Sequence, residues 1–185
     1  MSNFDIYLFG KIFGLAGKNP LVDYLGIFFA KYALYLFLIW LFLWAAMSRS
    51  ADVRRSRFKL FIFGFGTAIT TRFIFVEIIR QILPKPRPFV FFDIMPLISE
   101  PLLNSPSFPS GHAAFMFSFV TFLYLVNRKS GWFYILATLV SLSRIYVGVH
   151  WPSDVIFGAS LGILIGLAAY QFFAKQKISN FSNTW

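Results

Sequence analysis

The sequence predicts an all-α integral membrane protein, a bundle of about five transmembrane helices with an N-terminal helix lying in the membrane interface. Hydrophobic residues make up 58% of the 185 residues, charged residues make up 13%, and the mean hydropathy is +0.69. A soluble domain carries about 25% charged residues, so the composition indicates that the bilayer surrounds most of the chain. The length fits one domain, residues 1–185, and the absence of cysteine rules out disulfides.

Five apolar segments approach the roughly 20 helical residues that a membrane crossing requires. They are residues 21–47, 58–83, 112–126, 132–149 and 153–174. The third is short, and we expect Ser110 and Gly111 to lengthen it. Residues 3–16 are too short to span, and they predict an amphipathic helix in the interface. Asp5 and the lack of a small-residue cleavage site argue against a signal peptide.

The basic residues between the segments predict the orientation of the bundle. Two loops and the C-terminal tail carry Arg49, Arg54, Arg55, Arg57 and Lys59; Arg128 and Lys129; and Lys175 and Lys177. With five spans all three regions lie on one side, which is the cytoplasmic side by the positive-inside rule. Both histidines then lie on the external face, the periplasmic face of a bacterial inner membrane. The net charge of +10 therefore indicates topology and an anion pocket, and no nucleic-acid partner is expected.

The first motif lies at the outer end of the second segment. Arg80 is followed seven residues later by Arg87, and Pro84, Pro86 and Pro88 end the helix and stiffen the chain. Guanidinium groups match phosphate oxygens in bidentate fashion. Arginines that snorkel at a helix end are the alternative interpretation.

The second motif, Pro109-Ser110-Gly111-His112, opens the third segment. Ser110 suits an N-cap, and Gly111 lets the backbone approach a ligand closely. The free N–H groups at a helix N-terminus attract phosphate, and His112 would face the same point. A capped helix with an interfacial histidine is the alternative.

The third motif contains Arg144, His150 and Asp154, and His150 is one of only two histidines in the chain. Pro152 suits the first turn of the fifth helix. A carboxylate four residues after His150 can accept its Nδ1–H, which leaves Nε2 as a nucleophile. The alternative role of Asp154 is a favourable charge at a helix N-terminus.

Together the motifs resemble the type 2 phosphatidic acid phosphatase family, whose signature is K-x6-R-P, P-S-G-H and S-R-x5-H-x3-D. The last two match residue for residue, whereas Arg80 stands where the family has Lys, and Lys85 is a secondary candidate for that role. The resemblance implies an antiparallel helical bundle with its site at one membrane face. It also implies that His150 forms a phosphohistidine, that Asp154 orients it and that His112 protonates the leaving group. The implied phosphate-binding residues are Arg80, Arg87, Ser110, Gly111 and Arg144.

Neither a metal nor another cofactor is expected. No carboxylate cluster suits Mg²⁺, and two histidines without cysteine do not suit zinc. Glu77 lies one turn before Arg80, and we expect it to brace that arginine rather than to catalyse. Lys31 and Arg72 lie deeper in their segments, and the sequence does not assign their partners.

Two groups of residues outside the motifs leave alternatives open. Gly158, Gly162 and Gly166 form a small-residue stripe that favours packing within the bundle over dimerisation, and the sequence does not fix the oligomeric state. Four aromatic residues beside the motifs line a lipid-tail groove or form an interfacial belt: Phe89, Phe91, Phe92 and Trp151.

The expected substrate is a lipid phosphate, because the loop of residues 88–109 is short and apolar. Residues 11–23 resemble the bacitracin-resistance-type undecaprenyl-diphosphatases of this family, which implies removal of the terminal phosphate of undecaprenyl diphosphate. Phosphatidylglycerophosphate, phosphatidic acid and lipid A 1-phosphate are alternative substrates. A lipid or anion transporter that uses the motifs as a gate is the alternative of another class, and the pairing of His150 with Asp154 argues against it because a gate needs no nucleophile.

Overall fold

The computed structural model describes residues 1–99 and 105–175, and these residues form helices and connecting segments without a β-strand. The helices are α1 (Asn3–Phe13), α2 (Pro20–Lys31), α3 (Ala33–Ala46), α4 (Ala51–Thr70), the π-helical η1 (Thr71–Phe75), α5 (Val76–Ile82), α6 (Pro88–Phe91), α7 (Gly111–Val126), the 3₁₀ helix η2 (Arg128–Trp132), α8 (Phe133–Tyr146) and α9 (Pro152–Lys175). The predicted all-α fold is confirmed. Lys177, which the orientation argument used, lies outside the described residues.

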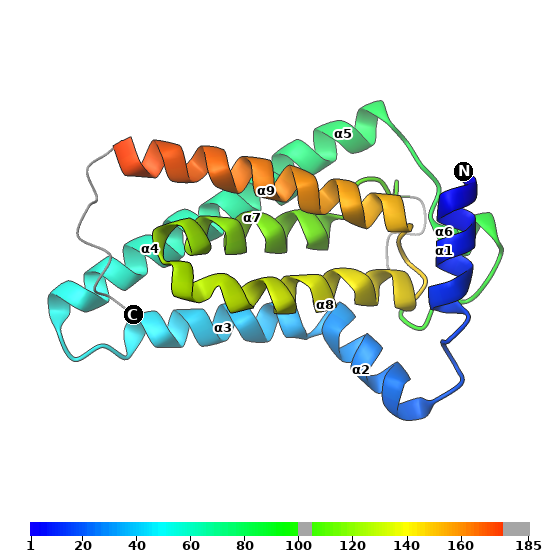
Figure 1. The fold of residues 1–185 in the computed structure, drawn as a ribbon, viewed down its shortest axis with the longest axis horizontal. Helices are drawn as coiled ribbons and strands as arrows, with labels where there is room; N and C mark the ends of the chain where they lie inside the picture. Colours follow the sequence, from blue (N-terminus) through cyan, green and yellow to red (C-terminus); the bar gives the residue numbers. More distant parts are fainter. Residues whose placement is uncertain (100–104, 176–185) are drawn as a thin grey trace.

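α7 is the central helix of the bundle and packs against α4, α8 and α9 (Figure 1). Its most extensive contact is with α9, along the glycine stripe. A Cβ atom on Gly162 would lie 2.5 Å from the carbonyl oxygen of Ala114, so only glycine permits this close approach. The stripe therefore serves packing within the bundle, as the sequence predicted.

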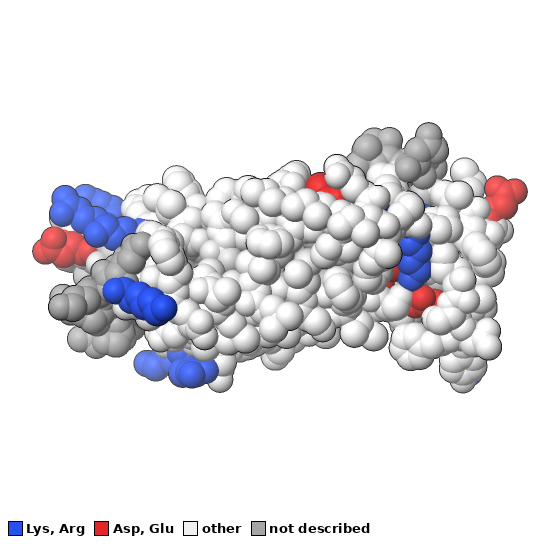
Figure 2. All heavy atoms as spheres, turned by 90° about the horizontal axis from the view of Figure 1, so that it is seen from above, with Lys and Arg blue, Asp and Glu red and all other residues white. Residues whose placement is uncertain are grey.

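The bundle has the surface of a protein that lies in a membrane. Large apolar side chains are exposed on its outer faces, among them Ile39, Ile62, Leu139 and Leu164. Figure 2 shows a long middle section that is almost free of Lys, Arg, Asp and Glu on the face seen, with most of the visible basic side chains at one end and a smaller group near the other. The chain is therefore an integral membrane protein, because this apolar surface would be unstable in water.

Within residues 1–99 and 105–175, fewer helices are long enough to span than the five predicted. Two segments have the length and hydropathy of a membrane crossing. One is residues 51–82, which comprise α4, η1 and α5, and the other is α9. The helices α2 and α3 pass the same test together as a bent pair. α7 has 16 residues, which span about 24 Å, against about 30 Å for the hydrocarbon core. The five-span count stays a prediction, since the shorter helices lie beside the long ones without the length to cross alone.

The first predicted span is not one straight helix. α2 and α3 meet at a 55° bend at Tyr32, where the chain leaves regular helical geometry (φ −112°). The carbonyl oxygen of Ala30 accepts a hydrogen bond from Arg144 Nη1 at 2.9 Å. Hydropathy alone could not reveal this bend, and the side chain that bonds to its backbone lies 114 positions later in the sequence.

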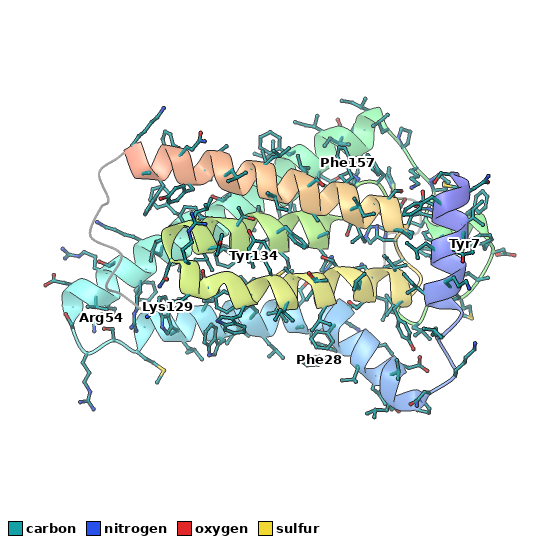
Figure 3. The ribbon with its side chains drawn as sticks, in the orientation of Figure 1. Tyr7, Phe28, Arg54, Lys129, Tyr134 and Phe157 are labelled. Atoms are coloured by element: carbon teal, nitrogen blue, oxygen red, sulfur yellow. The ribbon has the colours of Figure 1, made fainter. Side chains whose placement is uncertain are left out.

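The basic loop after the first span is shorter than predicted, because α4 begins at Ala51 rather than near residue 58. Arg54 and Arg57 therefore lie on the first turns of a helix, and Arg57 lies over the ring of Trp44. The basic residues nevertheless gather as expected. Figure 3 shows Arg54 and Lys129 at one end of the bundle and Tyr7 at the other.

α1 lies across the end of the bundle opposite the basic residues, beside α6 (Figure 1). It contacts α8 and α9, and Phe9 is buried against Trp151 and Ile145. The N-terminal segment is thus a helix, as predicted, and it closes the end of the bundle at which α7 and α9 begin and α8 ends.

Candidate active site

Three chain segments bring the motif residues together at the end covered by α1. α7 begins at Gly111, α8 ends at Tyr146 and α9 begins at Pro152. The N–H of Ser110 donates to the carbonyl oxygen of Asp154 at 3.0 Å, which ties the start of α7 to the start of α9. Residues that are distant in sequence therefore share one site.

His150 and Asp154 face each other in the interior, with 1% and 0% of their side chains exposed. His150 Nδ1 lies 3.5 Å from Asp154 Oδ2, which is longer than an ordinary hydrogen bond. The same Oδ2 accepts from the N–H of Trp151 at 2.9 Å. The expected pairing is therefore present as a close approach, while the carboxylate is fixed by other donors.

Burial lowers the pKa of His150 to about 4, and the positive charges of Arg87 and Arg144 act in the same direction, whereas Asp154 opposes them. Burial is the largest of these effects, so the Asp154 carboxylate, which also binds Lys85 and the Trp151 N–H, does not restore the ordinary pKa of the ring. The imidazole is consequently neutral at neutral pH, which is the state that a nucleophile needs.

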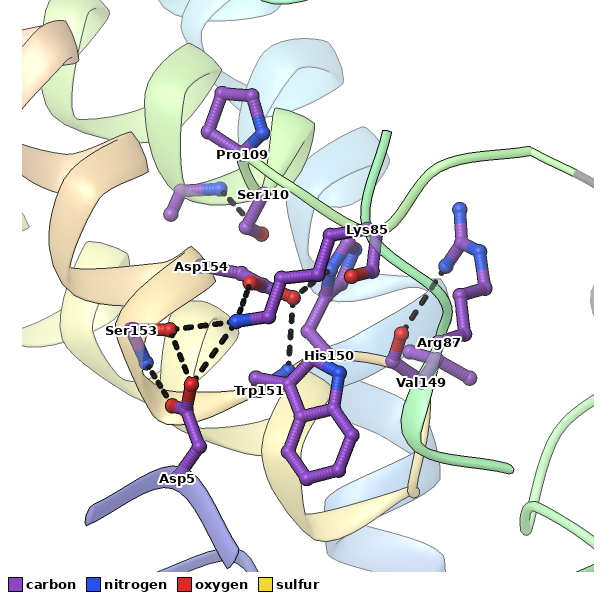
Figure 4. Close-up of polar contacts among 12 residues, drawn as sticks. Asp5, Lys85, Arg87, Pro109, Ser110, Val149, His150, Trp151, Ser153 and Asp154 are labelled. Atoms are coloured by element: carbon purple, nitrogen blue, oxygen red, sulfur yellow. Dashed lines mark hydrogen bonds and ion pairs between the residues drawn. The ribbon is translucent and has the colours of Figure 1, made fainter. Parts of the chain in front are cut away.

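Lys85 connects the Asp154 carboxylate to the N-terminal helix (Figure 4). Its ammonium group lies 2.9 Å from Asp154 Oδ1 and 3.0 Å from Asp5 Oδ2, and it donates to Ser153 Oγ at 2.7 Å. The sequence offered Lys85 as a substitute for the family lysine. The structure places it between two carboxylates, and its binding to phosphate stays a prediction.

Asp5 is the site residue whose role the sequence did not reveal. Its Oδ1 accepts from the Ser153 N–H at 2.9 Å, and its Oδ2 accepts from Ser153 Oγ at 2.8 Å. Burial alone would raise the pKa of Asp5, but the hydrogen bonds from Ser153 and Lys85 hold this pKa below its ordinary value. A lone carboxylate in an otherwise apolar N-terminal segment was the signal that could have identified it.

Arg87 and Arg144 are both buried, with 3% exposure each. Arg87 donates to the carbonyl oxygens of Val149 and Ser105 at 3.1 and 3.2 Å, and Arg144 donates to Ala30. These contacts orient the two guanidinium groups beside His150, whose pKa both of them affect.

Arg80 is held between Glu77 and the second motif. Its Nη1 lies 3.0 Å from Glu77 Oε1, and its Nη2 donates to the carbonyl oxygen of Pro109 at 3.3 Å. The bracing contact predicted for Glu77 is present. Glu77 also pairs with Arg72, a partnership that the sequence could not assign.

The start of α7 has the predicted cap. Ser110 Oγ accepts from the Ala113 N–H at 3.5 Å, a long hydrogen bond. His112 follows, half-buried, and lines a pocket of about 390 Å³ together with Gly111 and Arg72. The two histidines thus lie at the same end of the bundle on different helix ends.

The aromatic residues beside the motifs form a packed cluster. Trp151 is fully buried, its ring lies 5.3 to 5.7 Å from those of Phe9, Phe91 and Phe92, and its Nε1 donates to the carbonyl oxygen of Pro86 at 2.8 Å. Trp151 therefore belongs to neither a groove nor a belt. It anchors α1 and the loop after α5 over the site.

No group of three or more His, Cys, Asp or Glu side chains gathers as a metal site would require, within residues 1–99 and 105–175. The cationic side chains supply the positive charge of the site. Independence from metal stays a prediction that a chelator can test.

Comparison with known proteins identifies the family. Residues 59–178 match the family model of the PAP2 superfamily. Undecaprenyl-diphosphatase BcrC of Bacillus subtilis is 30% identical over 176 residues, which cover 92% of this chain and 83% of that protein. The undecaprenyl-diphosphatase of Sulfolobus acidocaldarius is 41% identical over 99 residues, which cover 51% of this chain and only 47% of that protein. The crystal structure of Aquifex aeolicus LpxE matches with a TM-score of 0.67 at 26% identity, covering 92% of this chain and 96% of that one. The family model, the relatives and the structural neighbour agree, and the chain belongs to the PAP2 superfamily, the family that its motifs predicted.

Proposed function

We propose that this protein is a metal-independent lipid phosphatase that converts undecaprenyl diphosphate to undecaprenyl phosphate. The names of the Bacillus subtilis and Sulfolobus acidocaldarius relatives support this substrate. The observation that carries the chemistry is the geometry of His150. Its Nδ1 faces the Asp154 carboxylate, so Nε2 is the ring atom left to react.

The reaction proceeds in two steps. In the first, His150 Nε2 attacks the terminal phosphorus, and the bond from that phosphorus to the bridging oxygen breaks. The electron pair stays on the bridging oxygen, which receives a proton from His112 and departs with the lipid phosphate. In the second, water attacks the phosphohistidine and gives a proton to His112, so that inorganic phosphate leaves and His150 is restored.

The remaining site residues act on the phosphoryl group. The transition state of phosphoryl transfer is loose, so catalysis relies on positioning the reacting groups and on stabilising the charge at the equatorial oxygens. Arg80, Arg87 and Arg144 supply guanidinium groups, and Ser110 and Gly111 supply the helix N-terminus. The charge of Asp154 stabilises the positive charge that develops on the His150 ring as Nε2 bonds to phosphorus.

The site faces the external side of the membrane, the periplasmic side in a bacterial inner membrane. This orientation is supported by the basic residues of the loops, such as Arg54 and Lys129, which lie at the opposite end of the bundle (Figure 3), because positively charged loops favour the cytoplasm. A cysteine introduced at Tyr7 should then react with a membrane-impermeant thiol reagent in intact cells, whereas one introduced at Arg54 should not.

Phosphate release by the purified protein tests the proposal. We expect release from undecaprenyl diphosphate in the presence of EDTA, with a higher kcat/KM than for phosphatidylglycerophosphate, phosphatidic acid or lipid A 1-phosphate. His150→Ala should abolish release, and Asp52→Asn, at the basic end of the bundle, should preserve it. Activity that EDTA removes and only a divalent ion restores would overturn the metal-independent mechanism.

Covalent trapping separates the enzyme from a transporter. Substrate labelled in its terminal phosphate should leave label on His150 after an alkaline quench, since phosphohistidine is stable in base. Lipid movement across a vesicle membrane without phosphate release or a labelled histidine would instead support a transport function.

A further inference from the structure

Arg72 lies at the site although none of the three motifs contains it. It belongs to the π-helical turn η1. In a regular α-helix, side chains five residues apart point about 140° away from each other, whereas the wider π-turn pairs residues i and i+5. The turn therefore lets Arg72 reach Glu77, five residues later, with which it forms an ion pair. π-Turns of this kind occur frequently at functional sites.

The side chain of Arg72 lies against the first residue of α7. A Cβ atom on Gly111 would collide with Cδ, Nε and Cζ of Arg72. The absence of a side chain at Gly111 lets Arg72 lie against the start of α7, in the pocket that Gly111 and His112 also line. The glycine of the second motif thus brings a fourth arginine to the start of α7.

Arg72 and His112 share a pocket that is otherwise mostly apolar. Apart from Gly111, its walls come from α3, from α4 and η1, and from α7: Leu34, Tyr35, Leu38, Phe65, Ile69, Phe73 and Phe115. His150, Arg87 and Arg144 are not among the described residues that line it. The pocket therefore holds the proposed acid without the proposed nucleophile, which places it on the side of the leaving group.

The charge of Arg72 is available to a ligand. Glu77 is shared between Arg72 and Arg80, so one carboxylate faces two guanidinium groups. The Arg72 side chain is 22% exposed, which leaves it accessible from the pocket. A buried and fully neutralised arginine would offer neither feature.

From these observations we infer that Arg72 binds the lipid-linked phosphate of a diphosphate substrate, the phosphate that departs with the lipid. This inference rests on the proposed function, and it gives the site a residue that distinguishes lipid diphosphates from lipid monophosphates. In a diphosphate, the terminal phosphoryl group lies at His150, the bridging oxygen at His112, and the next phosphate reaches Arg72 while the lipid chain follows the apolar walls. A monophosphate leaves Arg72 without a phosphate to bind.

Farnesyl diphosphate and farnesyl monophosphate form a matched pair for the test, because they differ only in this phosphate. Arg72→Gln should lower kcat/KM for the diphosphate about 10- to 100-fold, the loss expected for one hydrogen bond between charged groups. It should lower kcat/KM for the monophosphate less than about threefold on the same scale. Arg72→Lys, which keeps the charge, should recover part of the preference. Lys59→Gln, on the same long helix at the far end, is the control.

Glu77→Gln separates binding from a structural role. If Arg72 only supports Glu77, this variant should lose the diphosphate preference as Arg72→Gln does. If Arg72 binds phosphate, Glu77→Gln should alter the turnover of both substrates together and keep their ratio.

The outcomes distinguish the inference from the function on which it rests. A wild-type protein that hydrolyses only the monophosphate would overturn both. A wild-type protein that hydrolyses both substrates, with Arg72→Gln lowering both equally, would overturn the role of Arg72 and leave the phosphatase assignment intact.

Discussion

The contact between Asp5 and Lys85 gives the strongest test of how the N-terminal helix supports the site. The two side chains meet at 3.0 Å, with 3% exposure for Asp5 and 19% for Lys85. In Asp5→Asn an amide N–H₂ can replace the oxygen that accepts from Lys85, and the negative charge is lost. We expect the loss of this ion pair to cost about 2–3 kcal/mol, below the 3–5 kcal/mol of a fully buried pair.

That cost should appear in catalysis, because Lys85 also binds Asp154 at 2.9 Å. If the whole cost is expressed as misplacement of Lys85 and of α1, kcat/KM falls about 30- to 150-fold. Partial compensation by Ser153, which contacts both Asp5 and Lys85, would reduce the loss, so this range is an upper bound.

A double-mutant cycle with Asp5→Asn and Lys85→Gln isolates the coupling. Once Lys85 is replaced, the second change should cost little, which gives a coupling energy of about 2 kcal/mol in kcat/KM. Asp52→Asn, a carboxylate at the other end of the bundle, is the matched control, and thermal unfolding in detergent reports whether each variant is folded. Additive losses, with coupling below about 0.5 kcal/mol, would refute the connection between α1 and the catalytic carboxylate.

Three further predictions follow from the site and the packing. In His112→Gln, which leaves one histidine, the ¹³C NMR signal of the His150 ring should titrate near pH 4, so that the ring is neutral above that pH; a midpoint at or above 6.5 would contradict the role of burial. His112→Ala should reduce turnover of a lipid monophosphate more than that of a diphosphate, because an alkoxide needs protonation more than a phosphate leaving group does; equal losses would count against His112 as the acid. Gly162→Ala should lower the unfolding temperature by the equivalent of about 1–3 kcal/mol through overpacking, whereas Gly66→Ala, where a Cβ meets nothing within 4 Å, should leave it unchanged or raise it.

The sequence predicted the assembly of the motifs because each motif marks a helix end. Prolines after α5, the Ser110 cap on α7 and Pro152 at the start of α9 fix those ends locally. Antiparallel helices with short connections then bring alternate ends to the same side. The position of His150 and the approach of Asp154 follow from the same local signals.

Features stabilised by distant residues were beyond the sequence pattern. Arg144 bonds to the backbone beside the bend at Tyr32 from 114 positions away, and Asp5 bonds to Lys85 and Ser153, which lie 80 and 148 positions away. The π-turn at Thr71–Phe75 cannot be predicted from hydropathy, because one extra residue in a helical turn does not change the hydropathy of the segment. Periodicity and capping report local structure, whereas these features are tertiary.

The position of Asp154 suits a site that keeps the proposed nucleophile, His150, neutral and still stabilises the charge that would develop on it. Lys85 and the Trp151 N–H hold the carboxylate in place, while burial keeps the pKa of the His150 ring low despite the attraction of Asp154. In the proposed reaction the ring becomes positively charged as Nε2 bonds to phosphorus. The 3.5 Å separation can then close to a charge-assisted hydrogen bond in an interior where such a bond is strong. A shorter contact at rest would favour the protonated ring, which cannot attack, and a more distant carboxylate would leave the new charge without a partner.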